Sequence, residues 1–246
     1  MKDENVIENP VQPEKEKTME ELKNEFVKTI NNSFNVEEKD ISKIERINTE
    51  KSIVYIAYSI QQENKFYDID LNIPMINIKG NIPKEFNKVT QEVFVKKANE
   101  VRKNKNNAEK IIYSIDYVGY LNDNILSIII KSSLKQGNNP QRIIIQTYNY
   151  NIETKEKVSL NNIIEQKNIN VQELQNKIND VLKSVKKEET ILINSGYPVY
   201  ERNLESEIYK IENITNFFLN EEGKLYIVFA YGNQNFTSEF DIVKYE

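Results

Sequence analysis

Three aspartates are the residues whose type and spacing come closest to a catalytic arrangement. Asp68 and Asp70 stand two apart in the β-like segment KFYDIDLNI, and Asp116 lies in a later strand-like segment. Alternate residues of a strand point to one face, so Asp68 and Asp70 share a face. Glycoside hydrolysis uses such a pair of carboxylates as acid and base. The spacing is also common on solvated strand faces, and we favour that interpretation.

Metal and cofactor chemistry has little support in the sequence. The cluster Asn122-Asp123-Asn124 offers oxygen ligands, but it lacks the alternating ligands, the glycine and the closing glutamate of a calcium loop, so a turn is predicted. The chain has no His and no Cys, which removes thiolate sites, histidine bases and most zinc chemistry. We expect no catalytic residue, no metal ion and no cofactor.

One segment near the C-terminus combines residue types that suit ligand recognition. Its members are Tyr231, Gly232, Asn233, Gln234, Asn235 and Phe236. Aromatic side chains bury a large area at a small entropic cost, while amides adapt their hydrogen bonds to a partner. The same composition also fits an ordinary connection between two strands. Both interpretations remain open at this stage.

The elements that would position these residues are short strands in runs, with isolated helices between them. Thr18 and Glu21 have capping-box spacing before a helix that ends near residue 35. A second helix is predicted with Pro83 at its first position. Its apolar stripe is predicted to consist of Phe86, Val89, Val93, Ala98 and Val101. A third begins after Asn170. The pattern indicates an α+β fold of mainly antiparallel sheets packed with about three amphipathic helices.

Charge and hydropathy restrict the partners. The 246 residues include 33 basic and 38 acidic side chains, a formal charge of −5, which disfavours nucleic acid. No apolar run is long enough to span a bilayer, so we expect membrane attachment only through a segment absent from this chain. Residues 1–17 are charged and carry two prolines, which predicts a flexible tail.

The order of several segments resembles a bacterial envelope domain family. Asp70–Pro74 before a helix resembles the first half of a domain found in PdaC-type deacetylases. Tyr148–Ile152, Val158–Ile164 and the final hairpin around Glu222–Leu225 resemble the second half, known from RsiV-type anti-sigma factors. On this resemblance, residues 18–136 form a PdaC-like half and residues 137–246 an RsiV-like half packed against it.

The resemblance implies a non-catalytic, extracellular binding or sensor domain. Its protein ligand would be a lysozyme, or else a cell-wall glycan. This chain departs from the family in a shortened loop at Ala230–Phe236 and in a middle segment that includes Gln136, Asn138 and Asn139, which we take as further candidate ligand-binding residues. Two other functions remain open: an accessory domain of a peptidoglycan-modifying enzyme, or a structural lipoprotein.

Overall fold

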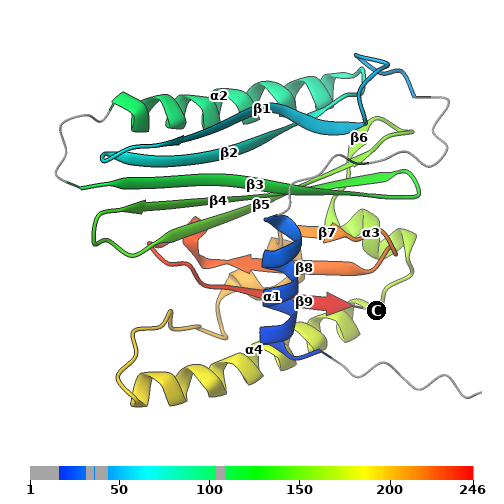
Figure 1. The fold of residues 1–246 in the computed structure, drawn as a ribbon. Helices are drawn as coiled ribbons and strands as arrows, with labels where there is room; N and C mark the ends of the chain where they lie inside the picture. Colours follow the sequence, from blue (N-terminus) through cyan, green and yellow to red (C-terminus); the bar gives the residue numbers. More distant parts are fainter. Residues whose placement is uncertain (1–16, 32–35, 37–43, 104–108, 246) are drawn as a thin grey trace, which may run out of the picture.

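The structure is a computed structural model, and it describes residues 17–31, 36, 44–103 and 109–245. Residues 1–16 of the predicted tail, and the end of the first predicted helix, therefore lie outside the described residues. The elements form an α+β fold, which confirms the predicted class (Figure 1). In the described part of the chain, no helix is long and apolar enough to cross a membrane.

Two β-sheets form the centre of the molecule. The larger has six strands in the order of the sequence: β1 (Val54–Glu63), β2 (Tyr67–Ile76), β3 (Ile111–Asn122), β4 (Ile125–Gln136), β5 (Arg142–Asn151) and β6 (Glu156–Lys157). The smaller sheet has three strands: β7 (Phe217–Leu219), β8 (Leu225–Ala230) and β9 (Phe240–Tyr245). Neighbouring strands are antiparallel except β2 and β3, which are parallel. A parallel pair needs a long crossover connection, and the helix between β2 and β3 provides it.

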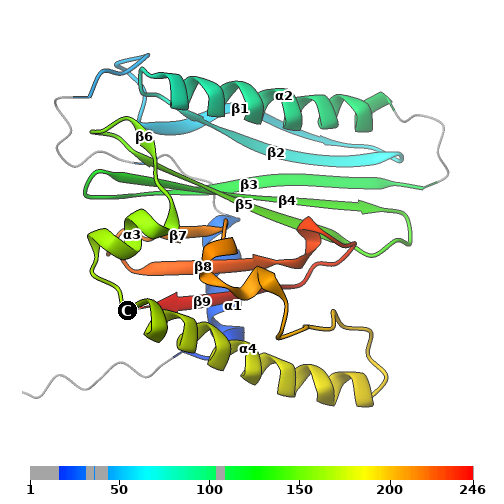
Figure 2. The same ribbon diagram turned by 180° about the vertical axis from the view of Figure 1, so that it is seen from behind.

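Four helices lie on these sheets: α1 (Met19–Ile30), α2 (Asn81–Lys103), α3 (Leu160–Gln166) and α4 (Val171–Asn194). Helix α2 covers one face of the large sheet, and the small sheet lies beside β4 and β5 (Figures 1 and 2). Helix α1 crosses the junction of the two sheets, while α4 runs along the far side of the small sheet. The described residues also form three short 3-10 helices: η1 (Glu207–Tyr209), η2 (Ile211–Asn213) and η3 (Tyr231–Asn233).

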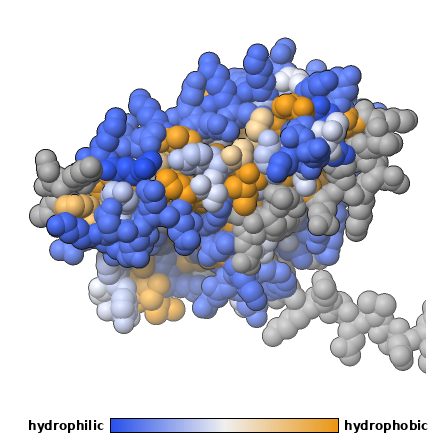
Figure 3. Space-filling model, turned by 45° about the horizontal axis from the view of Figure 1, so that its top comes forward, coloured by the Kyte–Doolittle hydropathy of each residue, from blue (hydrophilic) through white to orange (hydrophobic). Residues whose placement is uncertain are grey.

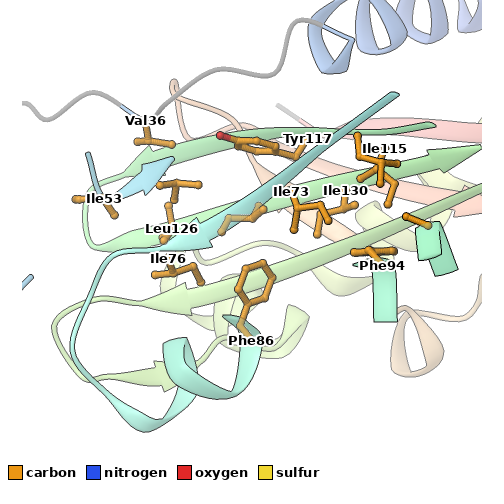
Figure 4. Close-up of a cluster of buried hydrophobic side chains, with 14 of the residues drawn as sticks. Val36, Ile53, Ile73, Ile76, Phe86, Phe94, Ile115, Tyr117, Leu126 and Ile130 are labelled. Atoms are coloured by element: carbon orange, nitrogen blue, oxygen red, sulfur yellow. The ribbon is translucent and has the colours of Figure 1, made fainter. Parts of the chain in front are cut away.

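The buried side chains form three clusters that follow these layers. The first lies between α2 and the large sheet and includes Phe86, Phe94 and Ile115 (Figure 4). The second joins α3, α4 and the small sheet. The third lies where α1 meets both sheets, and in it Phe26 packs against Phe218 and Phe240 with ring centroids 6.0 and 5.8 Å apart. Helix α1 therefore contributes to the packing of one sheet against the other.

The helix ends follow the predicted capping chemistry. Thr18 and Glu21 form the predicted capping box at the start of α1. The side chain of Asn170 accepts hydrogen bonds from the backbone N–H groups of Gln172 and Glu173 at the start of α4. The short helix α3 was not predicted as a helix, although Ser159 caps it with a box of its own.

Two expectations for α2 were wrong. The helix begins at Asn81, so Pro83 is not at its first position. Three residues of the predicted stripe are buried, namely Phe86, Ala98 and Val101. Val89 and Val93 are instead 44% and 56% exposed, because the middle of the packed face is formed by Thr90 and Phe94. The side of the molecule that carries α2 is mostly hydrophilic, with small apolar areas between the polar ones (Figure 3).

The division expected between residues 136 and 137 falls in the turn from β4 to β5. These two strands are paired from Ile125 with Asn151 to Leu134 with Arg142. Both halves of the chain therefore contribute strands to one continuous sheet. The small sheet comes only from the second half and packs beside the large sheet, and α4 covers the far side of the small sheet (Figure 1).

Candidate functional site

The segment that follows β8 is hydrogen-bonded along an edge of the large sheet. β5 is paired with β4 along its length, but on its other side β6 reaches only Tyr150 and Asn151. The rest of that edge receives other partners: the N–H of Ile143 donates to the carbonyl of Thr237 at 3.0 Å. The amide of Asn233 both accepts from the N–H of Ile145 at 3.3 Å and donates to its carbonyl at 3.2 Å. An unpaired sheet edge is thereby covered.

Gly232 is required by this close contact. A Cβ atom built on it would lie 1.8 Å from the carbonyl oxygen of Ile143, so no other residue fits without a shift of the backbone. Arg142 supports the same contact from β5. Its Nε donates to the carbonyl of Gly232 at 2.5 Å, and its Nη2 donates to the carbonyl of Asn233 at 3.2 Å.

Arg142 contacts one of the two predicted recognition segments and follows the other along the chain. Its guanidinium lies 5.4 Å from the centre of the Phe236 ring, a cation–π distance. The preceding β4–β5 turn carries Asn138 and Asn139, and Gln136 is the last residue of β4. Sequence reasoning missed Arg142, because a single arginine at the start of an apolar strand gives no local signal of such a role.

The structure divides the predicted residues into buried and exposed ones. Tyr231 is 2% exposed and Gly232 is also buried, so neither residue is at the surface. The amide of Asn233 is engaged by β5, as described. Gln234, Asn235 and Phe236 are exposed, Phe236 by 63%, and so are Gln136, Asn138 and Asn139. The β4–β5 turn and the segment after η3 lie at the same end of the molecule (Figure 1), and we call these six exposed residues together the turn surface.

A buried network of charged and phenolic groups supports the turn surface from below. The hydroxyl of Tyr231 donates to Oδ2 of Asp241 at 2.5 Å and lies 3.0 Å from the hydroxyl of Tyr209. Nε and Nη2 of Arg202 donate to the two carboxylate oxygens of Asp241 at 2.6 and 3.1 Å. Lys23 of α1 adds an ion pair with Asp241 at 2.9 Å. This network links α1, β9, η1 and the segment after α4.

The ionisation of this network follows from burial and charge. Burial alone would raise the pKa of Asp241, but hydrogen bonds from Arg202 and the charge of Lys23 outweigh it and hold that pKa below its ordinary value. Burial and the nearby Asp241 carboxylate raise the pKa of Tyr231, which keeps its hydroxyl protonated. Glu189 and Glu239 lie 3.5 and 3.0 Å from Arg202, so the buried charges are paired.

The three aspartates considered for acid–base chemistry lie on the face of the large sheet opposite α2. Ile69 and Leu71 are packed in the cluster beneath α2, so Asp68 and Asp70, which alternate with them, point the other way. On β3, Asp116 accepts a long hydrogen bond of 3.5 Å from the amide of Asn72. Among the described residues, no group of three or more acidic side chains is arranged to hold a metal ion.

The Asn122–Asn124 cluster forms a turn, as predicted. β3 ends at Asn122 and β4 begins at Ile125, with Asp123 at a φ of 50° between them. The amide of Asn124 donates to a carboxylate oxygen of Glu153 at 2.6 Å. These side chains therefore take part in hairpin and turn contacts.

Comparison with known proteins gives distant similarities of fold. No family model matches the chain, and no curated protein matches it. A solved DUF3298 family protein from Pseudomonas aeruginosa is similar over 74% of this chain and 83% of its own, with 12% identity and a TM-score of 0.45. A DUF3298 family member from Bacteroides fragilis is similar over 73% and 80%, with 12% identity and a TM-score of 0.36. The structural neighbours of the chain are thus DUF3298 family proteins, at a distance.

Proposed function

We propose that this chain is a non-catalytic ligand-binding domain of the bacterial cell surface. Its ligand is a protein such as a lysozyme, and it binds on the turn surface. The observation that carries the proposal is the presence of two exposed segments at the same end of the molecule (Figure 1). One has Phe236, whose ring centre lies 5.4 Å from the Arg142 guanidinium, and the other has three amide side chains.

Hydrogen bonds to β5 hold the turn surface in place, which favours recognition. The backbone of Gly232 and the amide of Asn233 are bonded to β5, so the exposed residues that directly follow them start from a fixed position. Ordering a loop before it binds lowers the entropic cost of association. A projecting aromatic ring beside an arginine is a typical anchor of a protein interface. Exposed amides around it can form hydrogen bonds with the ligand at the rim.

Charge adds to this argument through the rate of association. The formal charge of −5 gives the chain an attractive field for a basic protein such as a lysozyme. Such long-range attraction raises the association rate more than the affinity, and salt screens it. We therefore expect the association rate constant to fall with added salt while the dissociation rate constant changes little.

The buried network supports a binding role more than a catalytic one. Among the groups whose pKa values are shifted, Asp241 and Arg202 are 0% and 3% exposed and are paired with each other. A group that acts as acid or base must reach the substrate proton within hydrogen-bond distance. These two groups are enclosed by the fold and fix the position of Tyr231 at the base of the turn surface.

Calorimetric titration of the purified chain with a panel of lysozymes tests the proposal. We expect saturable binding that Phe236→Ala weakens by about tenfold or more, as for an interface anchor. Val93→Ala, at a similarly exposed position on α2, is the control and should bind as the unchanged chain does. Binding that Phe236→Ala leaves unchanged contradicts the assigned surface, and binding of wall fragments but of no lysozyme contradicts the protein ligand.

A further inference from the structure

The end of helix α4 carries a second exposed apolar group, away from the turn surface. Ile191, Leu192 and Ile193 are 66%, 42% and 42% exposed, and Tyr197 in the turn that follows is 61% exposed. We call these four residues the α4 tip. The turn projects from the molecule, since a Cβ built on Gly196 would meet no atom within 4 Å. Four large apolar side chains this close together are unusual on a surface whose exposed apolar residues are otherwise scattered.

The arrangement of the α4 tip indicates the kind of partner. Consecutive helical residues are about 100° apart, so Ile191, Leu192 and Ile193 together span about 200° of the helix circumference. A protein groove covers one stripe of a helix, with contacts three and four residues apart. An apolar helix end exposed on several sides is covered more completely by a medium that surrounds it than by a groove. The interfacial layer of a lipid bilayer is such a medium, and tyrosine is enriched there.

The position of the tip agrees with this partner. Helices α1 and α4 both contact β9, and the first residues of α1 lie on the same side of the molecule as α4 (Figures 1 and 2). Lys17 begins the described chain there, after sixteen residues that lie outside the description. If the proposed cell-surface domain is tethered through a preceding segment, its α4 side faces the membrane; this step rests on the proposed function.

We propose that the α4 tip inserts into the interfacial layer of a lipid bilayer and orients the domain on the membrane. Charges near the tip are mixed, because Lys187 and Glu188 are neighbours and Lys183 is paired with Asp180 at 3.7 Å. Attraction to anionic lipid is therefore small, and burial of the apolar side chains drives insertion. One such anchor binds weakly alone, and a tether raises its effective concentration at the membrane.

The absence of tryptophan from the chain permits a clean test of insertion. Tyr197→Trp places one indole at the tip, and Val93→Trp on α2 is the matched control. The probes are vesicles of phosphatidylcholine, with and without phosphatidylglycerol. We expect a blue shift of Tyr197→Trp emission and quenching by brominated lipid with both vesicle types, little changed by salt. Val93→Trp should show neither effect.

A second variant tests whether the apolar side chains of the α4 tip drive insertion. Ile191→Asn combined with Ile193→Asn in the Tyr197→Trp background should lower the vesicle partition coefficient by about tenfold or more. Both positions are exposed, so circular dichroism should show an unchanged fold. The proposal is overturned by the absence of a lipid-induced shift at saturating vesicle concentration. It is equally overturned by a protein-concentration-dependent shift without vesicles, which would assign the tip to a second copy of the chain. Neither outcome affects the lysozyme titration, because that experiment uses the turn surface.

Discussion

The buried carboxylate of Asp241 provides the sharpest test of how the fold is held together. It is 0% exposed, and it accepts hydrogen bonds from Arg202 and from the hydroxyl of Tyr231. Lys23 contributes a further charge at 2.9 Å. Asp241→Asn keeps the shape of the side chain but removes its negative charge. The buried guanidinium of Arg202 and the partly buried ammonium of Lys23 then lose their nearest counter-charge.

The magnitude follows from what remains around Arg202. Removal of one partner from a buried ion pair usually costs about 3–5 kcal/mol, because an uncompensated charge is left in the interior. Here the guanidinium still has Glu239 at 3.0 Å and Glu189 at 3.5 Å. We therefore expect Asp241→Asn to lower the free energy of unfolding by about 3 kcal/mol at neutral pH, the lower end of that range. Such a loss is a large part of the stability of a typical domain.

The same interaction predicts a dependence on pH. The pKa of Asp241 in the folded chain lies below its ordinary value of 3.8, so protonation favours the unfolded state. The stabilisation is fully present above the unfolded pKa and is lost as the pH falls through the folded pKa. Asp241→Asn should remove that part of the acid dependence, so the two proteins should differ most at neutral pH and converge below it.

Urea unfolding, followed by circular dichroism at several pH values, measures this effect. The midpoint urea concentration should fall while the slope of the free energy with urea is unchanged, as for a loss of stability alone. Glu222→Gln is the control, since its pair with Lys224 at 3.2 Å involves a 61% exposed carboxylate and should contribute little. A neutral-pH loss below about 1 kcal/mol for Asp241→Asn would refute the stabilising role of the network.

Substitutions at three further positions test other parts of the structure by the same unfolding assay. Gly232→Ala should cost about 2 kcal/mol or more and weaken ligand binding, because its Cβ meets the carbonyl of Ile143; an unchanged stability would contradict the close contact. Phe26→Ala should cost about 3 kcal/mol, since the ring is 8% exposed and packs against two other rings; a loss within error would show that α1 does not fix the sheets. Asn170→Ala should cost about 1 kcal/mol through loss of the α4 cap, and Asn170→Ser should retain most of the stability.

Local sequence signals were sufficient for the features that local chemistry determines. The fold class followed from strands arriving in runs, and the caps at Thr18 and Asn170 followed from residue type and spacing. The turn between β7 and β8 contains Gly223 at a φ of 75°, a conformation that glycine adopts readily. The caps and this turn depend on contacts within a few residues of the chain.

Features that depend on distant contacts were not predictable. Tyr231 is buried with its hydroxyl hydrogen-bonded to Asp241 and Tyr209, which lie in other elements of the fold. The sequence of the segment after β8 does not reveal whether that segment is free or bonded to the edge of β5. On α2 only the middle of the predicted stripe was wrong: Val89 and Val93 were preferred to the polar Thr90, which packs on the sheet instead. Helix α3, with seven residues, is too short for periodicity to identify it.

Hydrogen–deuterium exchange of the chain with and without a bound lysozyme tests the central claim most directly, because it locates the contact surface. The account predicts added protection in the β4–β5 turn around Asn138 and in the segment from Gln234 to Thr237, which includes Phe236. Protection confined to other elements, such as the end of α4 or the exposed face of α2, with these two segments unchanged, would contradict it.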